Sequence, residues 1–316
     1  MLNKRYNSIN TWLKENFGGR VYKVSLESGC SCPNRDGTID TQGCIFCNLS
    51  SYNPATASNG RKELPSVTLQ LEEGLDYVRK RHQADKVIAY FQRGSNTHAP
   101  ASVLESIFRE AASHPSVAGL AISTRPDCIS EEHINLFRNL PKLLWVELGL
   151  QSAHNNTLTL INRGHNAEQF ADTCRALAAA SIPVCAHVIL GLPHETPEMM
   201  IETAKFLNEQ KVWGVKIHNL HVLKNTKLEG LYNAGKVAIP LLSTYVDWVI
   251  AFLEVLDPSI IIHRVNSHSP RDLTHAPEWS INKLEILNEM EKQMEKRNTW
   301  QGKSYKTTTI PDHENR

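Results

Sequence analysis

From about residue 20 onward, short runs of apolar and β-branched residues alternate with longer segments of helical periodicity. This alternation predicts a parallel sheet whose right-handed crossovers place helices against it. The predicted strands span residues 21–26, 87–92, 120–124, 144–149, 184–190 and 215–221. The helices predicted between them span residues 68–82, 101–113, 130–136, 167–180 and 197–209. Since this is fewer than the eight units of a closed barrel, we expect an α/β fold with a partial (β/α)6 TIM-like barrel.

Three regions follow from this pattern. Residues 1–20 form an N-terminal helical segment with a helix over 9–16, and residues 21–235 form the barrel core. Residues 236–316 form a C-terminal extension that we expect to cover the substrate side. Within it, the pattern predicts a helix over 241–256, a short strand over 260–262 and a charged helix near 280–297.

The segments that follow the first five strands are rich in Gly, Pro, Asn, Gln and charged residues. These segments are 29–47, 93–97, 125–127, 150–152 and 191–195. In barrels of this kind the chemistry lies at the carboxyl ends of the strands, so we expect these segments to converge on one site.

Composition narrows the protein class. The chain is 41% hydrophobic and 21% charged, which is typical of a folded globular protein, and no apolar run reaches the length of a membrane-spanning helix. The polar start lacks the apolar core of a signal peptide, so we expect a cytoplasmic protein with reduced cysteines. The net charge of +1 gives no argument for binding RNA.

Four of the seven cysteines, Cys30, Cys32, Cys44 and Cys47, fall in one Gly-, Asn- and Asp-rich loop. A structural zinc site needs four ligands, usually in Cys-x-x-Cys pairs, and the Cys-x-Cys spacing upstream suits it poorly. A redox dithiol at Cys44 and Cys47 would suit a thioredoxin-like context, which the barrel pattern does not provide. A third interpretation is a [4Fe–4S] cluster held by three cysteines, with one iron open to a ligand.

The stretch Cys-Pro-Asn-Arg-Asp-Gly at 32–37, with Gly-Cys-Ile-Phe-Cys at 43–47, resembles the YhcC/YtqA-type branch of the radical SAM superfamily. That branch is similar to the catalytic subunit of Elongator. The resemblance extends over about residues 5–300 and includes motifs at 122–127, 147–152, 161–165 and 188–195. It implies a [4Fe–4S] cluster on Cys32, Cys44 and Cys47, with S-adenosylmethionine (SAM) on the open iron.

The resemblance also implies roles for other residues. It implies cofactor binding by a set of residues spread over the strand ends: Phe46 beside the adenine, Asn96, Thr97, Gln151, Arg163, Gly191 and Pro193. We expect Arg163 to hold the methionine carboxylate, since a guanidinium is a fixed fork for that group. Arg125 and Asp127 are expected to face the substrate as catalytic residues.

Two positions depart from the family pattern. Cys30 is a second thiol near Cys32, and we expect it to be a bystander rather than a ligand. Ser123 stands where related enzymes often have a glutamate, so another group would have to hold the amine of the cofactor.

The resemblance implies an enzyme that cleaves SAM reductively to a 5′-deoxyadenosyl radical, with an electron donor such as flavodoxin or ferredoxin. The Elongator-like branch favours modification of the wobble uridine of tRNA. Two alternatives stay open: a radical SAM enzyme for a small metabolite or tetrapyrrole-like compound, and a non-catalytic zinc-binding scaffold. On the substrate side we expect a polar pocket and a functional loop over 267–279; the histidines of this region are His218, His221, His263, His268 and His275.

Overall fold

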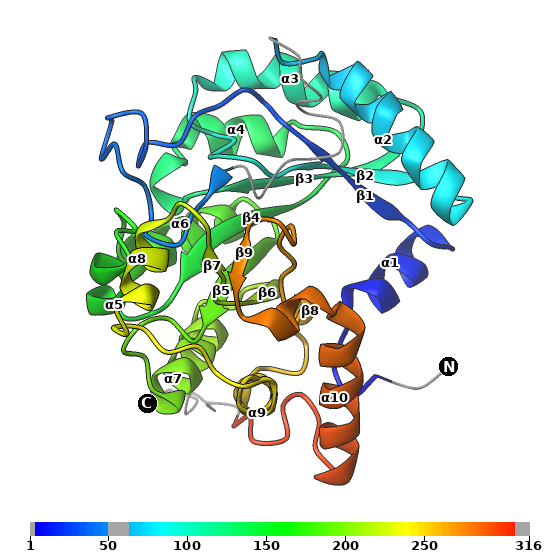
Figure 1. Cartoon of the computed structure of the whole chain (residues 1–316). Coiled ribbons are helices and arrows are strands. Elements are labelled where there is room, and N and C mark those ends of the chain that lie inside the picture. Colours follow the sequence, from blue (N-terminus) through cyan, green and yellow to red (C-terminus); the bar gives the residue numbers. More distant parts are fainter. Residues whose placement is uncertain (1–3, 50–62, 307–316) are drawn as a thin grey trace, which may run out of the picture.

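A single curled sheet of parallel strands organises the computed structural model, which describes residues 4–49 and 63–306 (Figure 1). Neighbouring strands are parallel throughout, in the order β1-β2-β3-β4-β5-β6-β8. The strands are β1 (Tyr22–Leu26), β2 (Val87–Phe91), β3 (Val117–Thr124), β4 (Leu143–Gln151), β5 (Val184–Leu190), β6 (Gly214–Asn219) and β8 (Ile261–Arg264). The sheet is an open half-barrel, which confirms the predicted fold class.

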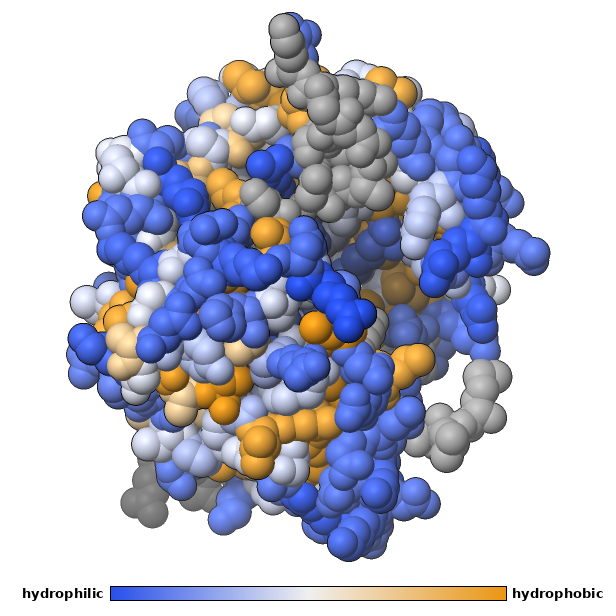
Figure 2. All heavy atoms as spheres, in the orientation of Figure 1, coloured by the Kyte–Doolittle hydropathy of each residue, from blue (hydrophilic) through white to orange (hydrophobic). Residues whose placement is uncertain are grey.

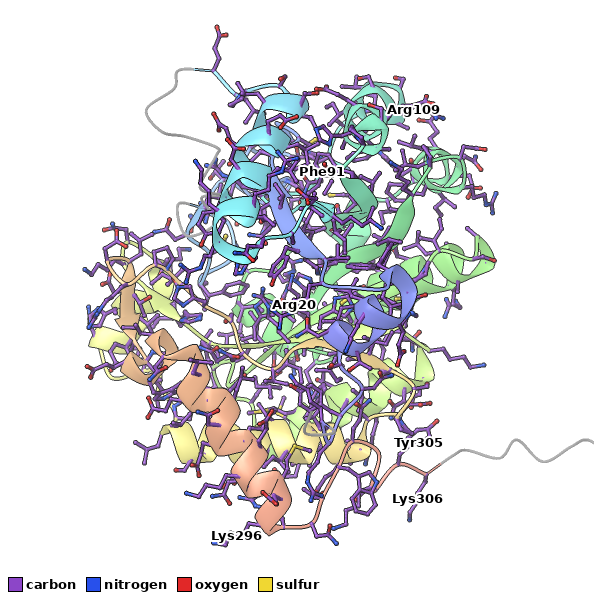
Figure 3. All side chains as sticks on the ribbon, turned by 90° about the vertical axis from the view of Figure 1, so that its right-hand side faces the viewer. Arg20, Phe91, Arg109, Lys296, Tyr305 and Lys306 are labelled. Carbon is purple, nitrogen blue, oxygen red and sulfur yellow. The ribbon has the colours of Figure 1, made fainter. Side chains whose placement is uncertain are left out.

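Helices cover the outer face of the half-barrel. They are α2 (Val67–His82), α3 (Ala101–Ser113), α4 (Glu131–Arg138), α6 (Ala167–Ala179), α7 (Pro197–Glu209) and α9 (Leu242–Val255). Apolar side chains fill the space between sheet and helices; Phe91 of β2, labelled in Figure 3, meets Phe108 of α3 with ring centroids 4.9 Å apart. Arg109 and Lys296, labelled in the same view, lie on the outer surface.

Helix α1 (Ile9–Phe17) closes the amino-terminal end of the half-barrel. Its Ile9 and Leu13 join an apolar cluster with residues of five strands: Ile88, Tyr90, Ala121, Trp145, Cys185 and Ile261. The ring of Trp12 contacts those of Trp145 and Trp213, at centroid distances of 6.1 and 5.1 Å. This apolar plug leaves the carboxyl ends of the strands as the open end.

The segment before α1 is tied to the far end of the chain. Ser8 forms a parallel bridge with Ile262 of β8. The side chain of Gln301 accepts a hydrogen bond from the backbone of Asn7 at 2.9 Å, and the backbone N–H of Gln301 donates to the carbonyl of Arg5 at 2.9 Å. The plug is therefore held by residues more than 250 positions away in the sequence.

The predicted elements agree closely with the observed ones, with one addition to the sheet. The strand predicted near residue 260 is β8, which pairs in parallel with β6 as a seventh strand of the main sheet. Residues from the predicted C-terminal extension thus complete the barrel wall. The loop predicted over 267–279 contains β9 (Thr274–Ala276), which pairs with β7 (Val222–Leu223).

Three further helices lie outside the βα alternation: α5 (Asn155–Leu160), α8 (Lys227–Asn233) and α10 (Lys283–Lys296). Helix α10 packs on α9 through Ile286, Met290 and Met294, and Figure 2 shows its outer side as a hydrophilic stripe. Among residues 4–49 and 63–306, no helix is both long and apolar enough to cross a membrane.

Candidate active site

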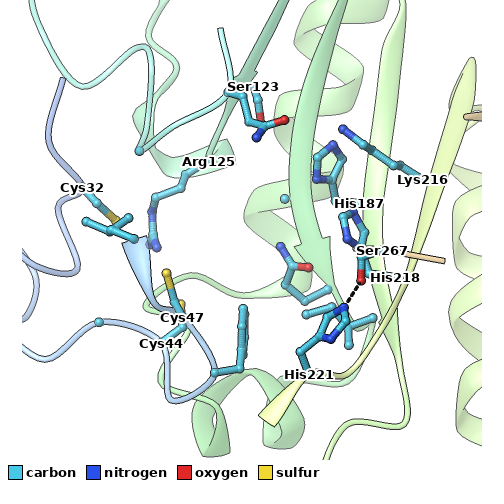
Figure 4. Close-up of a pocket in the computed structure, with 18 of the residues that line it drawn as sticks. Cys32, Cys44, Cys47, Ser123, Arg125, His187, Lys216, His218, His221 and Ser267 are labelled. Carbon is cyan, nitrogen blue, oxygen red and sulfur yellow. Dashed lines mark hydrogen bonds between the residues drawn. The ribbon is translucent and has the colours of Figure 1, made fainter. Parts of the chain in front are cut away.

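A cavity of about 330 Å³ opens inside the half-barrel, toward the carboxyl ends of its strands (Figure 4). Its wall includes the loop after β1, the ends of β3 and β4, and inward-facing residues of β5, β6 and β8. Three cysteines line one end: Cys32, Cys44 and Cys47, called here the three cavity thiols. The structure thus gathers the three predicted ligands at the mouth where the strand ends converge.

Tight turns shape the cysteine loop. The carbonyl of Cys32 accepts hydrogen bonds from the backbone N–H groups of Arg35 and Asp36, at 2.7 and 3.1 Å. The N–H of Cys47 donates to the carbonyl of Cys44 at 3.0 Å, as the Cys-x-x-Cys spacing requires for two thiols on one turn. This local geometry follows from the sequence.

The loop is also anchored to the segment between α5 and α6. The N–H of Ile45 donates to the carbonyl of Ile161 at 3.0 Å, and the side chain of Asn162 donates to the carbonyl of Gly43 at 2.9 Å and to Asp40 at 2.6 Å. These contacts span more than 110 positions in the sequence, and they hold the thiols at a fixed place over the strand ends.

Cys30, the fourth thiol of the loop, does not line this cavity. It lines a neighbouring pocket and packs partly against the main core, where burial raises its pKa. This position agrees with its predicted role as a bystander, which stays a prediction.

Cationic and polar groups surround the three cavity thiols. Arg163 Nη1 and Asn34 Nδ2 each lie 3.7 Å from Cys44 Sγ, within donating distance of a sulfur acceptor. Arg125 makes a two-pronged pair with Asp127 at 2.9 and 2.8 Å. Burial opposes the charge of Arg125, but Asp127 and the thiols of Cys32 and Cys44 raise its pKa.

Buried polar atoms without a partner provide a test of whether a cluster and its ligand fit here. Within the described part of the chain, these include Asn34 Oδ1, Ser95 Oγ, Arg125 Nη1 and Arg163 Nε. Leaving such atoms unpaired costs about 1–3 kcal/mol each. A polar, partly anionic group bound at the thiols would supply those partners, and three thiolates with an open fourth position suit a [4Fe–4S] cluster.

Three of the predicted cofactor residues line the cavity: Phe46, Gln151 and Arg163. Gln151 ends β4 with a φ of +78°, a left-handed conformation that costs a non-glycine residue about 1–3 kcal/mol. Its amide nitrogen and Arg163 Nη2 crowd the space beside Gly149, where an added Cβ would lie 2.8 and 2.3 Å from them. The absence of a side chain at Gly149 therefore gives both groups room at the cavity wall.

Asn96 and Thr97 are buried, but neither lines the cavity. Asn96 accepts from the hydroxyl of Ser28 at 2.7 Å and donates to the carbonyl of Ser123 at 2.8 Å. Thr97 shares a hydrogen bond of 2.6 Å with Thr124. These partners account for both side chains without a ligand, and the neighbouring Ser95, which the sequence analysis did not single out, faces the cavity instead.

Gly191 and Pro193 are also buried outside the cavity wall. Gly191 has a φ of +85°, and a Cβ there would lie 3.1 Å from the ring of Trp248 on α9. The glycine thus permits a left-handed turn after β5 and the close approach of α9. Asp127 likewise stays behind the wall, where it holds Arg125.

The floor of the cavity contains a charged network that the sequence analysis missed. Its centre is Glu147 of β4, whose side chain is fully buried. Five donors surround the carboxylate: Lys23 Nζ at 3.1 Å and Trp145 Nε1 at 3.0 Å on Oε1, and Tyr90 Oη at 2.6 Å, His187 Nε2 at 2.6 Å and Lys216 Nζ at 2.7 Å on Oε2. Burial opposes its ionisation, but Lys216 and Lys23 hold the pKa of Glu147 well below its usual range.

The basic partners of Glu147 are shifted too. Burial lowers the pKa of Lys216 to about 7, with Glu147 acting in the opposite direction. Burial and the nearby Lys216 lower the pKa of His187 to about 4, so its imidazole is neutral at neutral pH and donates through Nε2 to the carboxylate. Perturbed groups of this kind cluster at functional sites.

A polar residue inside an otherwise apolar strand was the available signal for this network. Lys23, Glu147, His187 and Lys216 each interrupt a run of apolar residues in a predicted strand. Successive side chains of a strand point to opposite faces of the sheet, so the register of each strand decides whether such a residue points into the barrel.

The C-terminal part of the chain contributes the far side of the cavity. His218, His221 and His268 line it, together with Ser267 and Ser269. His221 Nε2 lies 2.9 Å from the hydroxyl of Ser267, the contact drawn in Figure 4. The two other histidines predicted here lie elsewhere: His263 is packed against Trp145 and Trp213 below the cavity, and His275 pairs with Glu229.

Comparisons with known proteins agree with this geometry. A family model described as the radical SAM superfamily matches residues 35–207, and one described as a radical SAM C-terminal domain matches residues 212–296. Protein YtqA of Bacillus subtilis is 40% identical over 304 residues, which cover 96% of this chain and 93% of YtqA. This similarity confirms the resemblance to the YhcC/YtqA-type branch.

Similarity to Elongator-type proteins is more distant. The tRNA uridine(34) acetyltransferase of Methanocaldococcus infernus is 35% identical over 130 residues, 40% of this chain and 24% of that protein. The structure of Elp3 from the same organism, with residues 1–46 deleted, superposes with a TM-score of 0.68 at 20% identity. It covers 89% of this chain and 64% of that one, which shows a shared fold.

Proposed function

The chain belongs to the radical SAM superfamily, and we propose that it modifies the wobble uridine of tRNA, because part of it is similar to a tRNA uridine(34) acetyltransferase. Its class is established by the family: it is an enzyme that uses a [4Fe–4S] cluster and SAM. The alternative of a non-catalytic zinc-binding scaffold is thereby set aside. The proposal concerns the substrate and the roles of individual residues.

The three cavity thiols are the proposed ligands of the cluster, since they meet at one end of the cavity. Three thiolates would leave one iron of a [4Fe–4S] cluster without a protein ligand. When bound, the cluster and SAM together supply reductive cleavage of SAM to methionine and a 5′-deoxyadenosyl radical. The protein supplies position, exclusion of water and the electrostatic surroundings of the cluster.

Arg163, Arg125 and Gln151 line the same cavity as the three thiols. Arg163 keeps one N–H on Cys44 Sγ and another on the carbonyl of Gly149 at 2.8 Å, while its buried Nε has no partner within the described part of the chain. This arrangement suits a guanidinium that binds a carboxylate while it stabilises the negative charge of the thiolates. Phe46 offers an aromatic face beside the same thiols.

The similarity to a tRNA uridine(34) acetyltransferase is the observation that supports an RNA substrate. The similar region covers 40% of this chain. What we propose that the two proteins share is the nucleoside that they modify, uridine 34 of tRNA. The net charge of +1 supports the rival, a radical SAM enzyme that acts on a small metabolite. One experiment separates the two.

Total tRNA from cells with and without the intact gene is digested and its nucleosides are compared by mass spectrometry. The proposal predicts that one wobble-uridine derivative is lost and its precursor accumulates, and that a variant with Cys44→Ala does not restore it. An unchanged nucleoside profile would reject tRNA as the substrate and favour a small metabolite.

A further inference from the structure

Three polar residues form one row across the floor of the cavity. Lys216 of β6 is the register partner of His187 on β5 and of Arg264 on β8. Neighbouring strands lie about 4.8 Å apart, so side chains at paired positions are close neighbours on the same face. We call His187, Lys216 and Arg264 the polar row; all three line the cavity.

The polar row lies opposite the three cavity thiols. In Figure 4 the thiols enter from the loop on one side, while His187 and Lys216 project from β5 and β6 on the other. The residue at the same level on β4 is Gly149, the register partner of His187, which adds no side chain to the row. The cavity therefore has two chemically different ends, and the row belongs to the end away from the cluster ligands.

Cations exceed anions at this end. Glu147 is the carboxylate behind the row, and its two oxygens already accept from the donors described above. Lys216 and Arg264 lie close enough to His187 to affect its pKa, and Arg264 and Lys23 lie close enough to Lys216 to affect its pKa. Of the described residues that line the cavity, none is an aspartate or a glutamate. The floor thus carries positive charge that no side chain of the wall compensates.

Two donors of the row remain available. Lys216 uses two of its three N–H bonds, on Glu147 Oε2 at 2.7 Å and on Tyr90 Oη at 2.8 Å. The side chain of Arg264 forms no hydrogen bond or ion pair within residues 4–49 and 63–306, and Arg264 is an exposed residue that lines the cavity. Burial, together with the nearby positive charges of Arg264 and Lys23, lowers the pKa of Lys216. An anion bound beside Lys216 would raise that pKa again.

A metal ion is a poor occupant of this region. Glu147, Cys185 and His263 place one potential ligand atom each within 4.8 Å of one another. Both carboxylate oxygens are, however, fully engaged by N–H and O–H donors, and two lysine ammonium groups lie within 3.1 Å of them. A cation added there would meet two positive charges without a free carboxylate lone pair, so the surplus charge calls for an anion.

We propose that the polar row binds an anionic group of the substrate, a carboxylate or a phosphate, and so fixes the substrate opposite the three cavity thiols. Arg264 and the free N–H of Lys216 are the donors, and Glu147 is the positioning residue that holds Lys216 in the row. Arg fits both anions as a two-pronged donor. The inference rests on the proposed function only in assigning the reaction to this cavity.

The test measures anion binding to the cluster-loaded protein, with SAM present so that the cofactor site is filled. Equilibrium dialysis under anaerobic, low-chloride conditions with radiolabelled acetate or inorganic phosphate reports one class of anion at a time. The variants are Arg264→Gln, which removes the charge, and Arg264→Lys, which keeps it. Arg109→Gln, on the outer surface of α3, is the matched control for loss of one arginine.

We expect saturable binding of about one equivalent of one or both anions, weakened about tenfold or more by Arg264→Gln, as loss of a charge-assisted hydrogen bond implies. Arg264→Lys keeps the charge but loses the two-pronged geometry, so its affinity should lie between those of the wild type and Arg264→Gln, whereas Arg109→Gln should match the wild type. Binding of acetate alone identifies a carboxylate, and binding of phosphate alone identifies a phosphate. No saturable binding, or equal binding by wild type and Arg264→Gln, would overturn the proposal.

This result is independent of the tRNA experiment. An unchanged nucleoside profile would remove RNA as the substrate while leaving the anion measurement intact. If no anion binds but the nucleoside profile changes, the tRNA function stands and only the proposed role of the polar row is rejected.

Discussion

Replacing Glu147 with Gln tests whether the buried network is held together by its single carboxylate. The substitution keeps the shape of the side chain but places an amide among donors. Lys216, whose side chain is 4% exposed, then loses its anion, and so does Lys23. Removing one partner of a buried ion pair costs about 3–5 kcal/mol. We expect the free energy of unfolding to fall by an amount in that range.

The assay is urea unfolding of the cluster-loaded protein, followed by tryptophan fluorescence. Trp145 donates to Glu147 at 3.0 Å and stacks on Trp213, so the reporter lies at the site of the change. Glu105→Gln is the control, because its partner Arg109 lies on the surface, where such pairs contribute about 0–1 kcal/mol. A loss for Glu147→Gln no larger than that of the control would refute the reasoning.

The pH dependence of the stability difference between wild type and Glu147→Gln tests the same prediction a second time. Because the pKa of Glu147 is lower in the folded protein than in the unfolded chain, its contribution is complete above the ordinary glutamate pKa of about 4.3. That contribution disappears as the pH falls through the lowered folded value. The difference in stability between wild type and Glu147→Gln should therefore hold from pH 6 to about pH 5 and narrow at more acidic pH. A difference that widens on acidification would show the sign to be wrong.

Three further outcomes are expected from other parts of the site. Alanine at any one of the three cavity thiols should abolish iron binding and 5′-deoxyadenosine formation, whereas Cys30→Ala should keep both; iron and sulfide analysis after anaerobic reconstitution decides. Arg163→Lys should weaken SAM binding about tenfold or more in equilibrium dialysis, because a lysine cannot bridge thiol, carbonyl and ligand as a fork does; unchanged affinity would remove Arg163 from the cofactor site. Gly191→Ala should lower the free energy of unfolding by about 1–3 kcal/mol, because the φ of Gly191 is +85° and an added Cβ would lie 3.1 Å from the ring of Trp248. Gly230→Ala, inside α8 with open space around it, should instead raise the free energy of unfolding by up to about 1 kcal/mol. Equal effects of the two substitutions in urea unfolding would contradict this prediction.

The fold was predictable because each strand and helix has a strong local pattern. The strand 184–190 and the helices 101–113 and 197–209 were predicted with the bounds that the structure has. The role of residues 261–264 as a seventh barrel strand was not, because a strand of four residues is too short to indicate which sheet it joins. Their place depends on pairing with β6, nearly fifty positions earlier.

The cluster end of the site was predictable for a similar reason, since its thiols lie within one short loop. The floor was not. Glu147 and Lys216 are 69 positions apart, and each alone resembles a polar residue on the wet face of a strand. Asn96 and Gly191 show the reverse: each follows a strand end, as a cofactor ligand would, yet each is accounted for by contacts with its own neighbours.

The bonds between the segment before α1 and Gln301 bear on how the protein is made. A ribosome releases Trp12 and Leu13 long before it releases Ile262 and Gln301, which fix α1 in the end of the barrel. Until then the apolar face of α1 lacks part of the surface against which it packs, and it stays exposed on the growing chain. The cysteine loop and its anchor at 161–163 are complete much earlier. Assembly at the two ends of the barrel is thus separated in time, and chaperone contacts during synthesis should concentrate on the end closed last.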